Sequence, residues 1–149
     1  MGSIAYVVGQ HGAINVDYEV KDYRKARFRR ADAVADVYDF EVENNLIESS
    51  GAMSQSVRAG TEWKAGAWRF RAGWGIWPDP YTKDDARHGL PLTRYTGGLG
   101  WRNSRVSIDL ALQYDQRSSN YFAYDPSLVR PVNEDLSSMR TLVTFAWRP

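Results

Sequence analysis

The chain has 149 residues, 43% of them apolar, with a net charge of +1 and no cysteine. This composition fits one domain and excludes disulfide scaffolds and cysteine-ligated zinc sites, while the near-neutral charge argues against a nucleic-acid partner. Two histidines leave little for a histidine-built metal site, and no apolar run reaches the ~18 residues of a membrane helix. Residues 1–3 resemble an expression scar without a signal-peptide pattern, so we expect a piece excised from a longer protein.

Alternation of apolar and polar residues is the main pattern along the chain. After a short strand near residues 3–9, residues 13–23 place Ile14 and Val16 on one face and Asn15 and Asp17 on the other. The same period recurs around residues 57–64, 68–76, 95–101, 106–114 and 139–147. The sequence therefore predicts an all-β protein of about seven to eight strands.

Short and long connections between these strands alternate. Short turns fall at residues 9–12, 64–67 and 103–104, whereas residues 24–54, 78–93 and 116–138 form long segments. Outer-membrane barrels sort their connections in this way, with short periplasmic turns and long external loops. We therefore predict an antiparallel up-and-down transmembrane β-barrel, with a short helix in one long loop.

The strand count bears on domain organisation. A chain of seven strands that ends on the periplasmic side begins outside the cell, whereas bacterial single-chain barrels have even strand numbers. Residues 4–149 are thus predicted to form one barrel domain or the C-terminal fragment of a larger barrel. The partners would be the remaining barrel strands, or further copies in self-association.

Aromatic residues and arginines agree with a membrane barrel. Arginine outnumbers lysine fifteen to four, which suits paired cations in a confined lumen. The aromatic residues near predicted strand ends, where membrane girdles lie, are Tyr23, Phe28, Trp63, Trp68, Trp77, Tyr81, Tyr95, Trp101, Tyr114, Tyr121 and Trp147. In a soluble barrel the same aromatics would form the core and the charges the exterior, so the sequence leaves open which face is inside.

Several motifs in order resemble one family. They are Asn44-Asn45-Leu46-Ile47, Val57-Arg58-Ala59-Gly60-Thr61-Glu62-Trp63, Phe70-Arg71-Ala72-Gly73-Trp74, Pro78-Asp79-Pro80-Tyr81 and Gly97-Gly98-Leu99-Gly100-Trp101-Arg102. This order resembles the C-terminal third of FadL-like outer-membrane transporters, in their Bacteroidetes-type versions. The resemblance implies a bacterial outer-membrane location and passive uptake of long-chain fatty acids or aromatic hydrocarbons. The terminal aromatic residue and the N-terminal hatch of the family have no counterpart in this sequence.

Two groups of residues are candidate binding sites. A predicted helix opened by Asp32 carries one apolar face, made of Val34, Val37, Tyr38, Val42 and Leu46. The residues expected to contact a hydrophobic ligand come from this segment and from aromatics that flank the long loops: Val34, Val37, Tyr38, Phe40, Trp77, Tyr81, Tyr95 and Tyr121. Packing of this helix on the barrel rim and anchoring at the membrane interface are the alternatives. Lys25, Arg27, Arg29 and Arg30 form a basic cluster suited to lipopolysaccharide phosphates, or to an ordinary solvated face.

Catalysis is not expected. Asp84, Asp85 and His88 share a loop, but the sequence offers no second carboxylate pair, nucleophile elbow, phosphate loop or metal-ligand cluster. The sequence implies no cofactor, and the partners it implies are hydrophobic small molecules, lipids and lipopolysaccharide. A small self-contained barrel that binds lipid, or acts as an adhesin, is the alternative to a transport protein.

Overall fold

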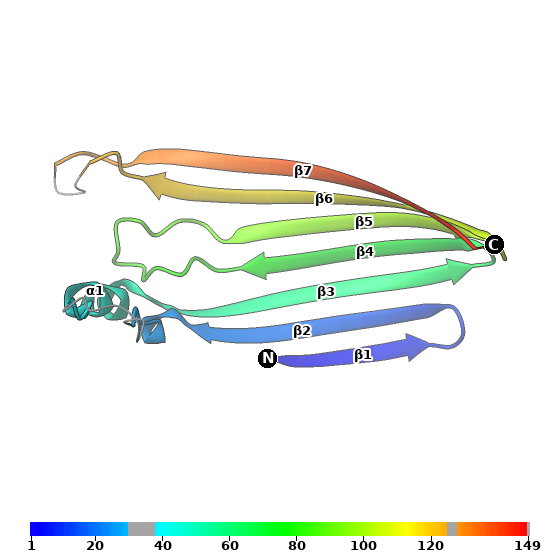
Figure 1. Cartoon of the computed structure of the whole chain (residues 1–149), viewed down its shortest axis with the longest axis horizontal. Helices are drawn as coiled ribbons and strands as arrows, with labels where there is room; N and C mark the ends of the chain where they lie inside the picture. Colours follow the sequence, from blue (N-terminus) through cyan, green and yellow to red (C-terminus); the bar gives the residue numbers. More distant parts are fainter. Residues whose placement is uncertain (30–37, 125–127, 149) are drawn as a thin grey trace.

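The computed structural model describes residues 1–29, 38–124 and 128–148, and these form one seven-stranded antiparallel sheet (Figure 1). The strands follow one another in chain order: β1 (Gly2–Val8), β2 (Gly12–Asp22), β3 (Met53–Ala65), β4 (Trp68–Trp77), β5 (Leu92–Arg102), β6 (Val106–Tyr121) and β7 (Val132–Trp147). A 3₁₀ turn, η1 (Tyr23–Lys25), and a helix, α1 (Glu41–Ser50), lie between β2 and β3. The predicted all-β, up-and-down topology is confirmed.

The predicted barrel is not closed. β1 and β7 are the two outer strands, and the described residues contain no pairing between them. Each edge strand pairs with one neighbour only, β1 with β2 and β7 with β6. The structure is therefore a curved sheet with two open edges.

Short and long connections lie at opposite ends of the sheet (Figure 1). The β1–β2, β3–β4 and β5–β6 turns share one end, which we call the turn end, and the three long connections share the other, the loop end. Gly9 and Gly66 adopt positive φ angles of 56° and 58° in two of the turns, a conformation that glycine enters without a steric penalty.

The third long segment is shorter than the predicted range of 116–138. β6 extends to Tyr121 and β7 starts at Val132, where these two residues pair, so the connection covers only residues 122–131. Residues 116–120 and 133–138 are mostly polar and lack an apolar alternation. Their strand conformation comes from the ladder between the two strands, which a periodicity argument does not detect.

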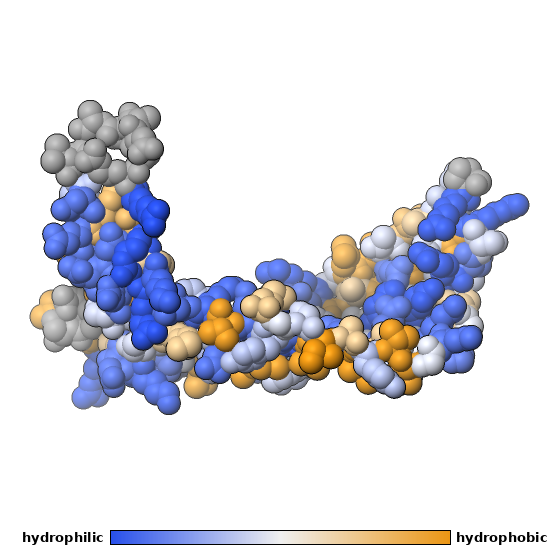
Figure 2. Space-filling model, turned by 90° about the horizontal axis from the view of Figure 1, so that it is seen from below, coloured by the Kyte–Doolittle hydropathy of each residue, from blue (hydrophilic) through white to orange (hydrophobic). Residues whose placement is uncertain are grey.

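One face of the sheet is apolar across all seven strands. Directly paired residues share a face, and one row across the sheet runs Ile4, Val16, Ala59, Trp74, Tyr95, Tyr114, Met139. Seen edge-on, the sheet is curved and hydrophobic residues gather mainly along its outer side (Figure 2). We call this surface the apolar face and the opposite one the polar face.

The sheet has no hydrophobic core of its own. Among the described residues no apolar side chain is buried, and the buried residues are all polar: Ser50, Ser54, Ser56, Asp79 and Asp115. A sheet with one apolar face has to cover it with another layer or with a non-aqueous medium. The described chain supplies no such layer.

Helix α1 begins later than the sequence predicted. Phe40 precedes it in a left-handed conformation (φ 59°), and Tyr38 lies outside the helix, so Tyr38 does not share a helix face with Val42 and Leu46. The physical reason is the bend at Phe40, with Asp39 accepting a hydrogen bond from the Glu41 amide. The predicted N-cap Asp32 lies outside the described residues.

Candidate functional site: the polar face and its two ends

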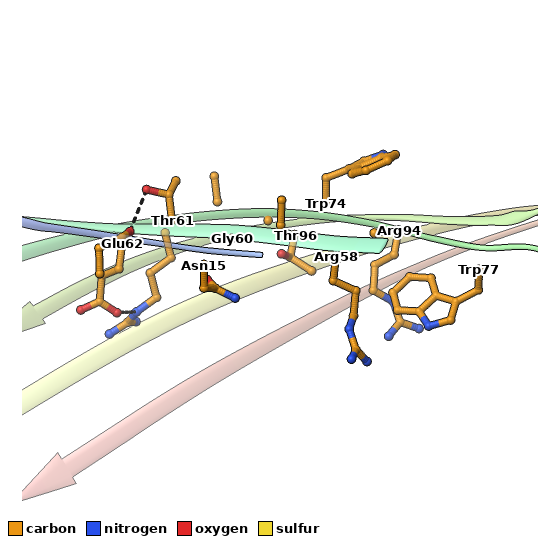
Figure 3. A pocket seen from close by; sticks show the side chains of 15 residues that line it. Asn15, Arg58, Gly60, Thr61, Glu62, Trp74, Trp77, Arg94 and Thr96 are labelled. Carbon is orange, nitrogen blue, oxygen red and sulfur yellow. Dashed lines mark hydrogen bonds and ion pairs between the residues drawn. The ribbon is translucent and has the colours of Figure 1, made fainter. Parts of the chain in front are cut away.

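A hollow of about 470 Å³ lies on the polar face over β2 to β5. Its floor includes three glycines, Gly60, Gly73 and Gly75, of which Gly60 and Gly73 pair directly across β3 and β4. In Figure 3, Arg58 and Arg94 extend from this side of the sheet, whereas Trp74 extends from the other. Because these glycines have no side chains, the hollow stays open beside the guanidinium groups of Arg58 and Arg94.

Ion pairs on this face connect neighbouring strands and, in one case, two strands with a third between them. Arg71 on β4 donates from Nε to Glu62 Oε2 on β3 (2.7 Å) and from Nη1 to Asp109 Oδ1 on β6 (2.7 Å). Arg69 adds a weaker contact to Glu62 (3.4 Å). This chain of charges, which we call the Arg71 network, links β3, β4 and β6 across the intervening β5.

A second group of ion pairs lies nearer the loop end. Arg94 holds Asp115 with two bonds, Nε to Oδ1 at 2.6 Å and Nη2 to Oδ2 at 2.9 Å, and Gln113 donates a third. Arg58 is more loosely paired, at 3.7 Å from Asp17 and 3.9 Å from Glu19. The sequence analysis did not single out Arg94 and Asp115. Their register position, Arg94 opposite Asp115, is visible only once β5 and β6 are aligned.

Glycines on β5 make the Arg71 network possible. Arg71 pairs with Gly98, and Gly100 pairs with Asp109, so the arginine reaches β6 over residues without side chains. A Cβ atom at position 100 would lie 2.5 Å from Asp109 Oδ1 and 3.5 Å from Arg71 Nη1. At position 97, which faces the other side, a Cβ atom would meet nothing within 4 Å.

Gly100→Ala is therefore expected to lower the free energy of unfolding by about 1 kcal/mol, because Asp109 has to leave Arg71. Gly97→Ala on the same strand is the control, with no loss or a small gain, because alanine restricts the unfolded chain more than glycine. Denaturant titration, followed by tryptophan fluorescence, measures both. In an Asp109→Ala background the Gly100→Ala loss should largely disappear; a full loss there would contradict the explanation.

The polar face also carries an apolar hollow. Residues around Gly98, Ala111 and Leu142 line a space of about 520 Å³. It is bordered by Arg71 and Asp109 on one side and by Gln113 and Arg140 on the other. An apolar molecule could thus contact apolar atoms on a face that is otherwise charged.

The predicted hydrophobic-ligand residues do not form one site. Trp77 packs with Arg94, whose guanidinium carbon lies 5.2 Å from the ring centroid, and it belongs to the polar face. Tyr95 lies on the apolar face between Trp74 and Tyr114. These two predicted partners are therefore on opposite sides of the sheet, because Trp77 lies three residues beyond Trp74, the direct partner of Tyr95, and side chains alternate along a strand.

The remaining members of that set lie apart at the loop end. Tyr38 and Phe40 do meet, edge to face, with ring centroids 5.1 Å apart, and Phe28 joins Phe40 at 5.7 Å. Tyr121 ends β6, and Tyr81 lies under the guanidinium of Arg87. Val34 and Val37 lie outside the described residues.

The predicted lipopolysaccharide cations are partly neutralised by acids. Lys25 lies 3.7 Å from Asp22, and Arg27 lies 2.6 Å from Glu48 on α1. Arg29 is exposed, and Arg30 lies outside the described residues. The Asn44 side chain on α1 accepts a hydrogen bond from the Phe28 amide and donates one to the Phe28 carbonyl. Together with the Arg27–Glu48 ion pair, these bonds pack the helix on the segment after β2. This packing agrees with the alternative of a helix seated on the rim.

The loop after β4 is held by its own charges. Arg87 donates to both carboxylate oxygens of Asp85 (2.9 and 2.7 Å), which holds the pKa of the Asp85 carboxyl below its usual value. The His88 Nδ1 atom lies 3.0 Å from the Tyr81 carbonyl oxygen. Asp79 is buried and lies 3.5 Å from Arg117 on β6, which ties this loop to the neighbouring strand.

Tyr38, which precedes α1, donates a hydrogen bond to Glu43 on the helix, and this bond raises the pKa of the Tyr38 hydroxyl. Within the described ranges no group of three histidine or acidic residues is arranged as metal ligands would be. In the same ranges no helix has the length and hydrophobicity needed to span a membrane.

The chain was compared with protein-family models, with curated proteins and with solved structures. None of the three comparisons returned a match. The likeness to FadL-like transporters therefore rests on the order of the sequence motifs, and the function has to be argued from the two faces of the sheet.

Proposed function

We propose that this chain forms part of the wall of a bacterial outer-membrane β-barrel that takes up hydrophobic molecules passively, such as long-chain fatty acids or aromatic hydrocarbons. The observation that carries the proposal is the uncovered apolar face, continuous over seven strands, with no buried apolar side chain among the residues that the structure describes. Such a face is stable against lipid and unfavourable against water.

Strand length and aromatic placement support a membrane environment. β2 to β7 have 10 to 16 residues, enough for the ~9–11 that a tilted strand needs to cross a bilayer. On the apolar face Trp68 and Trp101 pair near the turn end, and Trp74 and Tyr95 pair nearer the loop end. The two pairs stand six residues apart along each strand, about 20 Å, as expected for two girdles around an apolar band.

The polar face suits the lining of an aqueous passage. Arg71 and Arg94 on this face are paired with carboxylates, which limits the cost of placing their charges away from bulk water. The apolar hollow at Gly98, Ala111 and Leu142 interrupts these charges. A hydrophobic molecule passing along this face would find apolar contact there.

The edges indicate what completes the barrel. Lipid-exposed strand edges leave backbone groups without hydrogen bonds, which a bilayer does not tolerate. β1 and β7 run in the same direction, because each is an odd strand of an up-and-down meander. An antiparallel barrel can therefore close only through an odd number of further strands between them, and we infer that such strands are the partners of both edges.

A test uses the absence of cysteine to introduce single probes. Leu110→Cys on the apolar face and its neighbour Ala111→Cys on the polar face are each labelled with an environment-sensitive fluorophore in lipid vesicles. We expect nitroxide-labelled lipids to quench the probe at 110 and aqueous cobalt to quench the probe at 111, since the residues face opposite sides.

The alternative function makes a different prediction for the same two variants. In a self-contained lipid-binding barrel the apolar face encloses a cavity, so the probe at 110 would be reached by neither quencher. Folding without detergent or vesicles into a compact β-protein would support that alternative as well and would overturn the proposed function.

A further inference from the structure

Three polar side chains surround the floor of the glycine-lined hollow on the polar face. Asn15 on β2, Gly60 on β3, Gly73 on β4 and Thr96 on β5 form one continuous row of paired residues, so all four lie on the same face. Arg58 lies two residues from Gly60 on β3 and therefore points to the same side (Figure 3). All five residues line the hollow.

Asn15 and Thr96 extend over the two glycines from opposite sides. The Asn15 Oδ1 atom lies 2.7 Å from the place that a Cβ atom of residue 60 would take, and the Thr96 Oγ1 atom lies 2.6 Å from the same place at residue 73. Because Gly60 and Gly73 are direct partners, the carboxamide and the hydroxyl flank one point of the sheet. Neither side chain forms a hydrogen bond with any residue that the structure describes.

The Arg58 guanidinium is the third polar group at this point. It lies 3.7 Å from Asp17 and 3.9 Å from Glu19, beyond hydrogen-bond distance, and neither acid lines the hollow. Within the described ranges its only hydrogen-bond contact is with the Met1 sulfur, at 3.9 Å. The hollow thus offers the donors of one cation, one carboxamide and one hydroxyl, which together suit a single carboxylate.

The shape of the hollow favours a short, flat body next to that carboxylate. At the loop end the Trp77 ring extends over the third floor glycine, with the Arg94 guanidinium carbon 5.2 Å from its centroid. At the turn end the hollow is bordered by the ion pair of Arg71 with Glu62. Arg58 and Glu62 are four residues apart on β3, about 13 Å. A long alkyl chain in this hollow would cross the charges of the ion pair, whereas one or two aromatic rings fit before it and can contact the indole.

We propose that this hollow binds an aromatic carboxylate, with the carboxylate on Arg58, Asn15 and Thr96 and the ring against Trp77. Charge-assisted hydrogen bonds to the carboxylate and an aromatic contact with the indole supply the binding free energy. The proposal rests on the proposed function, because it needs the polar face to line the passage. It adds aromatic acids to the fatty acids and hydrocarbons considered above.

The test compares three ligands by equilibrium dialysis on the full chain in phosphatidylcholine vesicles, with binding to protein-free vesicles subtracted. The ligands are 2-naphthoate, its neutral counterpart 2-naphthylmethanol and the aliphatic acid decanoate. We expect 2-naphthoate to bind at least about tenfold more tightly than the alcohol, which lacks the charge. It should bind about fivefold more tightly than decanoate, which lacks the ring. Equal binding of the naphthoate and the alcohol, or equal or tighter binding of decanoate, would overturn the site.

Two variants separate the charge from the ring contact. Arg58→Gln should lower the affinity for 2-naphthoate at least about tenfold and leave that for the alcohol unchanged. Trp77→Leu should lower the affinity for 2-naphthoate about fivefold and leave that for decanoate unchanged. Arg102→Gln is the matched control with unchanged affinity, because Arg102 lies on the same face opposite Ser107, outside the hollow. Full affinity for 2-naphthoate in Arg58→Gln would contradict the proposal.

Failure of this site is distinct from failure of the proposed function. Far-UV circular dichroism in the vesicles checks that each variant keeps its sheet, and the ligand comparison on the unmodified chain needs no variant. Quenching of the probes at positions 110 and 111 is measured in the same vesicles. The expected quenching without binding of 2-naphthoate would overturn the site alone, whereas a probe at 110 that lipid nitroxides do not reach would overturn the proposed function.

Discussion

Leu112→Arg is expected to lower the free energy of unfolding in lipid vesicles by about 2–4 kcal/mol, the cost of an arginine near the middle of a lipid-facing surface. Leu112 lies on the apolar face, paired with Gly97 on β5 and Thr141 on β7. Its row falls between the Trp68–Trp101 and Trp74–Tyr95 pairs. The guanidinium would have to reach an interface or draw water into the bilayer.

The neighbouring residue provides a matched control. Gln113 lies on the polar face and donates to Asp115, and an arginine at 113 can make the same contact. Gln113→Arg should therefore change the free energy of unfolding by less than about 1 kcal/mol. Denaturant titration of both variants, followed by tryptophan fluorescence, makes the comparison. Equal losses at 112 and 113 would contradict the assignment of different surroundings to the two faces.

Arg71→Gln is expected to be the most damaging single change on the polar face, with a loss of about 1–2 kcal/mol. Arg71 is bonded to two carboxylates, and its removal leaves Glu62 and Asp109 without their cation. The Arg71 side chain is 39% exposed, so screening by water keeps the loss below that of a fully buried pair.

A double-mutant cycle identifies the cause. If the loss comes from the ion pair, the unfolding free energies lost in Arg71→Gln and in Asp109→Asn should not add in the double variant. Their coupling free energy should be at least about 0.5 kcal/mol. Arg69→Gln is the control, because its only contact with Glu62 is long, at 3.4 Å, and its loss should be smaller. Additive losses for positions 71 and 109 would mean that the network does not stabilise the fold.

Much of the fold could be predicted because strand periodicity is local. Ile14, Val16, Tyr18 and Val20 alternate with charged residues, and this pattern is sufficient to assign β2 and its faces. Glycine-containing turns such as Gly66-Ala67 lie between two alternating runs and mark a hairpin. The same argument failed at 116–121 and 132–138, where polar residues adopt strands because a partner strand is present.

The candidate site was harder to predict because it depends on register. Trp77 and Tyr95 flank the same loop in the sequence, yet they belong to opposite faces of the sheet. Arg94 and Asp115 are 21 residues apart, and only the alignment of β5 with β6 brings them into contact.

The sequence by itself determined the all-β class, the order of short and long connections, and the division of each strand into an apolar and a polar side. These features follow from the two-residue period of a strand and from turn residues, both of which are local. The tertiary structure decided which residues of different strands meet: the Arg71 network over Gly98 and Gly100, the glycine-floored hollow on the polar face, and an apolar groove between Trp68, Trp101 and Leu110. Such contacts depend on register between strands, and register is set by pairing across the whole sheet.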